Sequence, residues 1–586
     1  MTRTASAIAR AVNAREVGAR QVAQEAIAAA AAYDAIQPAT WIARLGEGDV
    51  LSLADAVDRR IADGEQLPLA GVPFAIKDNI DLAGLPTTAA CPDFAYLPQE
   101  SAFVVQRLID AGAIPLGKTN LDQFATGLNG TRSPHGAPAC VHNRAFISGG
   151  SSSGSAVAVG AGIVAFALGT DTAGSGRVPA AINGLVGMKP SKGRWSTSGL
   201  VPACRSLDCI SVFTRTIDDA ALVDSVVAGL DPQDPFSRPL EDVDRPARRI
   251  GVPLPAQRNF LGDAASAFLY QKALDSLAAA GATLVEIDVT FLSEAAELLY
   301  GGPWVAERTA ALKELLDENP DAMNPTVREI VEAGLGISAV ELFRGEYRLK
   351  ALARKAEEMW RNIDLLALPT APTVYRIAEM LAEPIRLNSA LGLYTNFVNL
   401  LDMAAVAVPA GLRANATGFG ITLIGPADSD RALLEAADAY IAASDLPSPP
   451  PLDLEGKVQT VKLAVVGAHL KDMPLHWQLT SRDARFIGAF ETAPHYRLYA
   501  MADSVPPKPA LVHSEDGGPI ALEVYELGVA EFGSFVAEVP APLAIGTVTL
   551  ADGSSVKGFV AEPRAMTGAQ DITSLGGWRA YMAQRG

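Results

Sequence analysis

Two short segments rich in serine and glycine carry the residues of this chain that could perform nucleophilic chemistry. The first is SGGSSSGS (148–155) and the second is GTDTAGSGR (169–177). A run of serine and glycine normally marks a flexible linker. The first segment leads directly into an apolar stretch, however, which predicts a buried loop held by its serines. The second follows an apolar strand and places Ser175 in a loop of small residues. A serine hydroxyl in such a loop can attack a carbonyl carbon while nearby backbone N–H groups stabilise the oxyanion.

A nucleophilic serine needs a base that takes its proton. The first 445 residues contain only two histidines, His135 and His142, and neither has an evident carboxylate to orient it. Lys77 follows the apolar run VPFAI (72–76), and burial there would lower the pKa of its amine. A neutral lysine can accept a proton, so serine–lysine chemistry is possible without histidine. On the residues alone, an ion pair between Lys77 and Asp78 is the competing interpretation.

With these residues, the sequence resembles the amidase signature family over residues 65–440. The matching text is GVPFAIKDNI around Lys77, GGSSSGSAVAV around Ser151 and LGTDTAGSGRVPA around Ser175. The resemblance implies that Ser175 is the nucleophile, Ser151 a bridging serine in a cis peptide, and Lys77 the base. The proton of Ser175 would pass through Ser151 to Lys77 and return to the leaving ammonia, after which water releases the acyl group.

Other groups in the loop that carries Ser175 have expected roles as well. Asp171 and Arg177 flank it, and we expect them to form an ion pair that fixes the loop. We expect four consecutive backbone N–H groups to stabilise the oxyanion, those of Thr172, Ala173, Gly174 and Ser175.

The segment LLYGGPWVAERTAAL (298–312) resembles the allophanate hydrolases of that family. Tyr300 and Arg308 lie eight residues apart, close to two helical turns, so one helix face could present both. A guanidinium matches a carboxylate bidentately, and allophanate carries a carboxylate beside its terminal amide. The resemblance implies that both residues bind substrate. An Arg308 at the helix surface, paired with Glu307, is the alternative. NGTRSPHG (129–136) resembles the same subfamily more weakly.

Residues 460–586 resemble the C-terminal domain of allophanate hydrolases, through VVGAHLKDMPLHWQL (465–479) and DITSLGGWRAY (571–581). This resemblance implies a fold similar to γ-glutamyl cyclotransferases and the decarboxylation of N-carboxycarbamate, the product of the first step. We expect His469 to transfer the proton there, because histidine titrates nearest to neutral pH. A histidine with a structural hydrogen bond is the alternative. The weaker candidates are His476, His495 and His513.

The hydrophobic pattern predicts the elements that hold these residues. Predicted strands alternate with predicted helices, which favours an α/β fold with a mixed or mostly parallel sheet and helices on both faces. The strand-like runs lie at 72–76, 113–117, 163–169, 248–255 and 364–373, and the helical runs at 5–33, 103–112, 217–230 and 285–360. We therefore expect a mixed amidase-signature sheet flanked by helices, plus a smaller α+β C-terminal domain.

The clearest boundary is SDLPSPPPLDLEGK (444–457), with four prolines between positions 447 and 451. Such a stretch neither pairs in a sheet nor continues a helix, so it predicts a semi-rigid linker. We place an amidase signature domain at 1–445, the linker at 446–459 and the C-terminal domain at 460–586.

Composition and motifs argue against several other classes of protein. The chain has 586 residues and a formal net charge of −18, so most of its surface would repel nucleic acid. GAIPLGKT (112–119) matches a P-loop in letters, but apolar residues and Pro115 occupy the positions that should cradle phosphate. Four scattered cysteines favour neither a disulfide framework nor a zinc site. We expect no metal and no organic cofactor.

The sequence also indicates where the protein is located and which partners it has. The N-terminus shows no apolar segment typical of a secretion signal, and no membrane span is predicted, so we expect a cytoplasmic protein without a membrane partner. The resemblance implies a homodimer acting on a small-molecule substrate that a urea carboxylase supplies, in urea or s-triazine degradation. Three alternatives stay open: an amidase of broader specificity, an amidase subunit that acts only with partner chains and tRNA, and a C-terminal domain that is a non-catalytic dimerisation or binding module.

Overall fold

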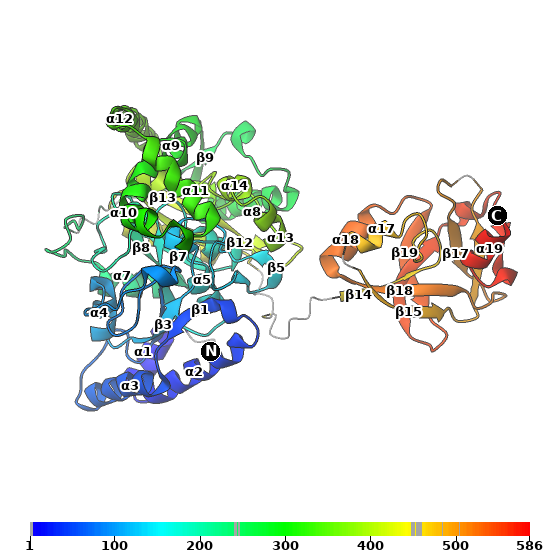
Figure 1. Ribbon diagram of the computed structural model, residues 1–586, viewed down its shortest axis with the longest axis horizontal. Coiled ribbons are helices and arrows are strands. Elements are labelled where there is room, and N and C mark those ends of the chain that lie inside the picture. The colour runs from blue at the N-terminus through cyan, green and yellow to red at the C-terminus, as the bar shows by residue number, and fades with distance from the viewer. Residues whose placement is uncertain are drawn as a thin grey trace. The chain divides into compact units, whose positions relative to one another are not determined.

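The computed structural model describes residues 4–239, 243, 247–446, 452, 460–482, 484–502 and 504–585. The chain divides into two compact units, Met1–Glu455 and Gly456–Gly586 (Figure 1). The predicted linker at 446–459 lies outside the described residues except at Leu446 and Leu452. Within the described parts of the chain, no helix is both long and apolar enough to cross a membrane.

A mixed sheet of 11 strands forms the centre of the first unit, in the order β1-β3-β2-β6-β8-β7-β12-β13-β11-β9-β10. Its strands are β1 (Trp41–Arg44), β2 (Pro73–Lys77), β3 (Ile114–Thr119), β6 (Phe166–Asp171), β7 (Val186–Lys189), β8 (Cys209–Thr214), β9 (Arg249–Pro253), β10 (Thr283–Ile287), β11 (Leu365–Pro369), β12 (Met403–Leu412) and β13 (Gly418–Pro426). A separate small sheet pairs β4 (Ala139–Cys140) with β5 (Asn143–Ile147). The prediction of a mixed sheet is confirmed.

Helices cover both faces of this sheet. They are α1 (Ala5–Asn13), α2 (Ala19–Asp34), α3 (Glu47–Ala62), α4 (Phe103–Asp110), α5 (Ser153–Gly160), α6 (Val178–Ile182), α7 (Ile217–Val227), α8 (Ala264–Ala279), α9 (Thr290–Tyr300), α10 (Trp304–Glu318), α11 (Pro325–Ala333), α12 (Ala339–Asn362), α13 (Ile377–Ala382), α14 (Arg386–Leu391), α15 (Phe397–Leu400) and α16 (Asp430–Ala443). The region predicted to be helical from 285 begins only at α9, because residues 285–287 complete β10.

The side chains of β11 show how the two faces are filled. Successive residues of a strand point to opposite faces of its sheet. Leu365 and Ala367 lie in a large apolar core that also contains α8 and α16. Leu366 and Leu368 lie in a second core, with residues of α9, α12 and α15. Strands buried on both faces explain why these segments read as continuous apolar runs.

The P-loop lookalike is a helix-to-strand turn. Helix α4 ends at Asp110 and β3 begins at Ile114, so the inner residues of the motif form the strand itself. Gly112 has a φ of +94°, a conformation that favours glycine at the turn. Lys118 is fully buried and its Nζ lies 3.0 Å from the carboxylate of Asp78. The lysine of the motif is thus held in a buried ion pair.

The second unit contains a five-stranded sheet, in the order β15-β18-β14-β20-β19, and a three-stranded sheet, β17-β16-β21. The strands are β14 (Thr460–Val465), β15 (Arg485–Glu491), β16 (Tyr496–Ala500), β17 (Pro509–His513), β18 (Ala521–Gly528), β19 (Leu543–Thr549), β20 (Ser555–Ala561) and β21 (Gln570–Asp571), and the helices are α17 (Trp477–Thr480), α18 (Val529–Ala537) and α19 (Trp578–Gln584). The last element is helix α19, whose buried Trp578 joins this unit's own core. Similarity to γ-glutamyl cyclotransferases stays a prediction.

Candidate active site

Lys77 and Ser151 are in direct contact inside the first unit. Lys77 ends β2, is fully buried, and donates hydrogen bonds from Nζ to Ser151 Oγ at 2.7 Å and to Thr170 Oγ1 at 2.6 Å. Strands β2 and β6 run parallel, so Lys77 and Thr170 lie near the same edge of the sheet. The Gly150–Ser151 peptide bond is cis, as the resemblance implied.

The surroundings of Lys77 favour its neutral form. Burial lowers the pKa of the amine from 10.5 to about 7, although the carboxylates of Asp122, Asp208 and Asp171 act in the opposite direction. The competing ion pair with Asp78 is not formed, because that carboxylate lies against Lys118 instead. A lysine that is about half neutral at pH 7 can serve as a proton acceptor.

The serines after the cis bond hold their loop against β6. Ser152 Oγ donates to the Thr170 carbonyl at 3.1 Å and accepts the Thr170 N–H at 3.2 Å. Ser155 Oγ donates to the Leu168 carbonyl at 2.9 Å. A side chain at Gly150 would collide with the Asp122 carboxylate, so the loop can approach this closely only with glycine there. The prediction of a buried, serine-held loop is confirmed.

Ser175 lies in the same buried region and is 3% exposed. Its Oγ donates to the Gly127 carbonyl at 3.4 Å. No hydrogen bond joins Ser175 to Ser151 among the residues described. The structure therefore brings Lys77 and Ser151 together, whereas the passage of a proton from Ser175 to Ser151 stays a prediction.

Asp171 and Arg177 form the expected ion pair. The guanidinium Nε lies 2.8 Å from the Asp171 carboxylate, and both side chains are fully buried. The carboxylate also accepts the backbone N–H groups of Gly174 and Gly176. Burial alone would raise the pKa of Asp171, but Arg177 and these hydrogen bonds hold it below its ordinary value. This ion pair fixes the loop on both sides of Ser175.

The Asp171 contact also reduces the number of backbone N–H groups that can stabilise an oxyanion. Because the Gly174 N–H already donates to Asp171 at 2.9 Å, it is not free for an oxyanion in this geometry. In the described part of the chain, no acceptor is found for the N–H groups of Thr172, Ala173 and Ser175. The oxyanion role stays a prediction for these three groups.

Asp171→Asn is expected to destabilise the first unit by about 3–5 kcal/mol, because it leaves the Arg177 guanidinium buried without its counter-charge. Urea denaturation of the full chain measures this change. Asp55→Asn is the matched control, since Asp55 pairs with Arg20 at the surface and should change stability by at most about 1 kcal/mol. Equal effects of the two substitutions would contradict the structural role of Asp171.

Tyr300 and Arg308 meet, but not on one helix. Helix α9 ends at Tyr300 and α10 begins at Trp304, so the expectation of a single helix face is wrong, and the chain turns at the intervening Gly-Gly-Pro. The Arg308 guanidinium lies 5.2 Å from the centre of the Tyr300 ring, and Nη2 donates to the Tyr300 hydroxyl at 3.4 Å. Glu307 instead accepts hydrogen bonds from Ser206.

Arg308 reaches the loop that touches Ser175. Its side chain is buried, and Nη1 donates to Thr126 Oγ1 at 3.1 Å. The neighbouring residue, Gly127, accepts the hydrogen bond of Ser175. The Nε atom of Arg308 is buried and has no partner among the described residues. A cation with an unsatisfied donor thus contacts Thr126, the residue adjacent to the one that Ser175 contacts.

Three residues of this site, Arg132, Asp122 and Asp208, were not predicted individually. Arg132 donates to the carbonyls of Thr126 and Pro384, and its Nε also lacks a partner in the described structure. Asp122 accepts three backbone N–H groups of the loop 129–132. Burial raises the pKa of Asp208 to about 6, against hydrogen bonds from Thr172 and backbone groups. Only Arg132 had a signal in the sequence, its place in NGTRSPHG.

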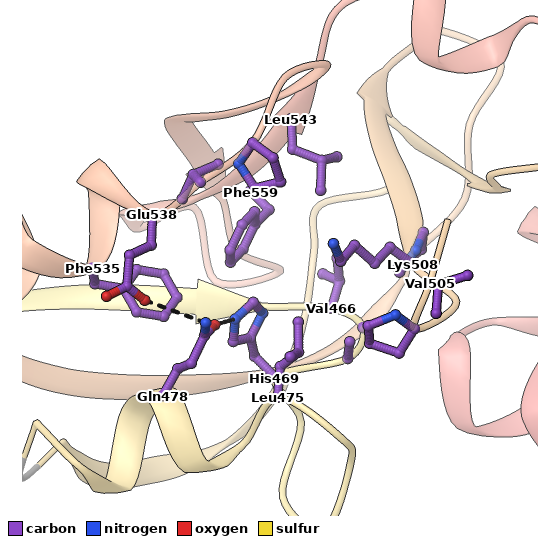
Figure 2. A pocket seen from close by; sticks show the side chains of 16 residues that line it. Val466, His469, Leu475, Gln478, Val505, Lys508, Phe535, Glu538, Leu543 and Phe559 are labelled. Atoms are coloured by element: carbon purple, nitrogen blue, oxygen red, sulfur yellow. Dashed lines mark hydrogen bonds between the residues drawn. The ribbon is translucent and has the colours of Figure 1, made fainter. Parts of the chain in front are cut away.

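In the second unit, His469 lines a cavity of about 220 Å³ (Figure 2). Its Nε2 lies 2.7 Å from Gln478 Oε1, and its ring packs against Phe559 and Phe535. Burial lowers the pKa of His469 below its ordinary value. The three weaker candidates are not among the cavity-lining residues: His476 lies against Tyr525, and His495 lies against His513.

Two protein families match this chain, one over each unit. The amidase family matches residues 25–434, and the allophanate hydrolase C-terminal domain matches residues 461–583. Urea amidolyase of Lachancea kluyveri is 45% identical over 573 residues, 92% of this chain and 31% of the relative. The chain therefore spans about a third of the urea amidolyases it matches.

Two further relatives match over nearly their whole length. A glutamyl-tRNA(Gln) amidotransferase subunit of Deinococcus deserti is 35% identical over 487 residues, 76% of this chain and 98% of the relative. The solved structure of Kluyveromyces lactis allophanate hydrolase is 40% identical with a TM-score of 0.66, covering 96% of this chain and 99% of that one.

The amidase family model covers most of the first unit, and the solved structure shares its fold. The chain belongs to the amidase family, and the resemblance noted in the sequence is thereby confirmed.

Proposed function

We propose that this chain is an allophanate hydrolase. The first unit hydrolyses the terminal amide of allophanate, giving ammonia and N-carboxycarbamate, and the second unit decarboxylates that product. The observation that carries the proposal is the loop at Thr126 and Gly127, where a buried cation, Arg308, and a buried hydroxyl, Ser175, touch adjacent residues. A small amide that ends in a carboxylate suits that pair of groups.

Ser175 is the proposed nucleophile of the first step. Neutral Lys77 takes the proton of Ser151, Ser151 takes the proton of Ser175, and Ser175 Oγ bonds to the amide carbon. The N–H groups near Ser175 stabilise the oxyanion, and each lowers the activation barrier by about 3 kcal/mol. The C–N bond then breaks, and the proton returns through Ser151 to the leaving ammonia. Water attacks the acyl-enzyme by the same route and releases N-carboxycarbamate.

Arg308 is the proposed ligand of the substrate carboxylate, supported by Tyr300. Arg308→Lys should raise the KM for allophanate roughly 10–100-fold, because an ammonium cannot reproduce the bidentate contact of a guanidinium. Steady-state kinetics should show a smaller change for biuret, which has no carboxylate. Arg328→Lys on α11 is the matched control, since Arg328 lies at the surface. Equal losses with both substrates would contradict the carboxylate role.

His469 is the proposed proton-transfer group of the second unit. His469→Ala should leave the first ammonia release unchanged while CO2 release slows toward the rate at which N-carboxycarbamate decays by itself, because general acid–base catalysis contributes roughly 10²–10⁴-fold. Parallel stopped-flow assays of ammonia and CO2 measure the two steps. His513→Ala is the control within the same unit, outside the cavity. Unchanged CO2 release would favour a non-catalytic dimerisation or binding module.

The function itself is tested by ammonia release from allophanate, compared with biuret, malonamate and longer amides. We expect allophanate to have the highest kcat/KM. Equal rates on longer amides would favour an amidase of broader specificity, and inactivity of the purified chain would favour a subunit that needs partner chains.

The cellular location, the oligomeric state and the source of the substrate are proposals as well. We propose a cytoplasmic homodimer that receives allophanate from a urea carboxylase. The names of the relatives support the metabolic link. Sedimentation of the purified chain tests the oligomeric state, for which a single species of about twice the 61.2 kDa chain mass is expected.

A further inference from the structure

The cavity of the second unit contains a cation whose role the proposed decarboxylation leaves unassigned. Lys508 precedes β17, and Figure 2 shows its side chain entering the cavity on the side away from Gln478. Among the described residues, no carboxylate pairs with it. Glu538, which also lines the cavity, is held instead by Arg482 at 2.5 Å. A cation without a counter-charge in a largely apolar cavity favours an anionic ligand.

A row of hydrogen bonds leads from Glu538 to His469. Gln478 Nε2 donates to the Glu538 carboxylate at 3.3 Å, and Gln478 Oε1 lies 2.7 Å from His469 Nε2. An ionised carboxylate can only accept hydrogen bonds, so it faces the amide NH2 and turns the amide oxygen toward the histidine. An amide oxygen also only accepts. The neutral imidazole must therefore carry its proton on Nε2.

The other ring nitrogen of His469 is then the one available for chemistry. Nδ1 makes no hydrogen bond in the described residues, and it is not one of the fully buried atoms that lack a partner, so part of its surface is accessible. Phe559 stacks on the ring with centroids 5.1 Å apart, and Phe535 meets it edge-on at the same distance. These contacts hold the ring in place from two sides.

We propose that Lys508 binds a carboxylate of the substrate in this cavity, and that Gln478 is a positioning residue that keeps Nδ1 of His469 as the proton-transferring atom. This inference rests on the proposed decarboxylation. The bond between nitrogen and one carboxylate carbon of N-carboxycarbamate breaks, and its electron pair goes to nitrogen. Nδ1 has no proton in the neutral ring, so it first takes one from the solvent and the ring becomes an imidazolium. As the C–N bond breaks, the substrate nitrogen takes this Nδ1 proton, CO2 leaves, and the retained carboxylate stays on Lys508 as carbamate. The ring is then neutral again, with its proton on Nε2.

The ligand class is a small dianion with two carboxylates one atom apart. Malonate is a stable probe, because a CH2 group replaces the NH of N-carboxycarbamate. The chain has six histidines, so the imidazole signals of the full-length protein are few, and His469→Gln identifies the signal of His469. The nitrogen shifts of this signal report directly which ring nitrogen carries the proton.

The Lys508 contact is tested by titrating malonate into the ¹⁵N-histidine-labelled full chain. We expect malonate to shift the His469 signal, and Lys508→Gln to weaken this binding roughly 10–100-fold, the usual range for a lost hydrogen bond to a charged group. Lys557→Gln, an exposed lysine on β20, should bind like the wild type. Equal affinities for the two variants would overturn the role of Lys508, as would a wild-type His469 signal that malonate does not move.

The Gln478 contact is tested by the same signal without ligand. The wild type should show a protonated Nε2, and Gln478→Glu should keep that tautomer while raising the pKa of His469, since it adds a negative charge beside the ring. Gln478→Leu should let the Nδ1-protonated tautomer appear, with a matching change in the pH profile of CO2 release. A wild-type His469 protonated on Nδ1 would overturn the positioning role.

Failure of the inference and failure of the proposed function give different results. If His469→Gln slows CO2 release while Lys508→Gln does not, only the inference is wrong. If His469→Gln leaves CO2 release unchanged, the decarboxylation proposed for this unit is itself wrong.

Discussion

Lys77→Met is expected to lower ammonia release from allophanate by roughly 10⁴-fold or more, the scale seen when a hydrolase loses a member of its catalytic set. Methionine fills similar space but cannot accept the proton that reaches Ser151. Initial rates over a range of substrate concentrations should place the loss in kcat. The same measurement on His135→Ala should give the wild-type rate, because His135 makes no hydrogen bond to Ser151 or Ser175 in the described structure.

The pH dependence follows from the same lysine. Only the neutral amine accepts a proton, and its pKa is about 7. The value of kcat/KM should therefore fall about tenfold per pH unit below pH 7 and level off above it. A profile that stays flat down to pH 5 would contradict the role of Lys77.

The folding stability of Lys77→Met shows whether its loss of activity could come from unfolding. The folded-state pKa of about 7 lies below the ordinary value of 10.5, so the unfolded chain binds more protons between these two pH values. Burial of Lys77 thus opposes folding most strongly below pH 7, and this penalty fades as pH rises toward 10.5. At pH 7 it is on the order of 4 kcal/mol. Lys77→Met should be at least as stable as the wild type, even with the hydroxyls of Ser151 and Thr170 left without their donor.

Ser175→Ala is expected to abolish turnover to a similar extent, roughly 10⁴-fold or more, because no other hydroxyl among the described residues donates to the Gly127 carbonyl. Substrate binding should survive, since the proposed carboxylate contact is made by Arg308. Calorimetry of allophanate binding to the inactive variant separates the two effects. Adding Arg308→Lys to Ser175→Ala should weaken that binding. Residual turnover above about one per cent would contradict a nucleophilic role for Ser175.

The contact between Lys77 and Ser151 could be predicted from the sequence because short motifs carry both residues. The meeting of Tyr300 and Arg308 was predicted from helical spacing, yet the structure achieves it by a turn between two helices. Spacing therefore gave the correct pair for the wrong reason.

Other parts of the site could not be predicted, because they depend on tertiary contacts. The loop 126–132 is held by Asp122 through backbone N–H groups, and no residue type in the loop signals this. Gly174 was expected to serve the oxyanion, but its N–H is used by a side chain three residues earlier. In the second unit, the proton-transfer role of His469 is predicted because the residue is a histidine in a matching motif. Lys508 and Glu538 line the same cavity from distant segments of the chain.

Direct titration of the Lys77 amine is the most direct test of the proposed mechanism. The full-length Ser175→Ala protein, labelled with ¹⁵N-lysine, allows the Nζ signal of Lys77 to be followed with pH and assigned by comparison with the Lys77→Met, Ser175→Ala double variant. The structure predicts a transition near pH 7, more than three units below that of an exposed lysine. A Lys77 that stays cationic throughout the pH range of activity, together with full turnover in Lys77→Met, would contradict it.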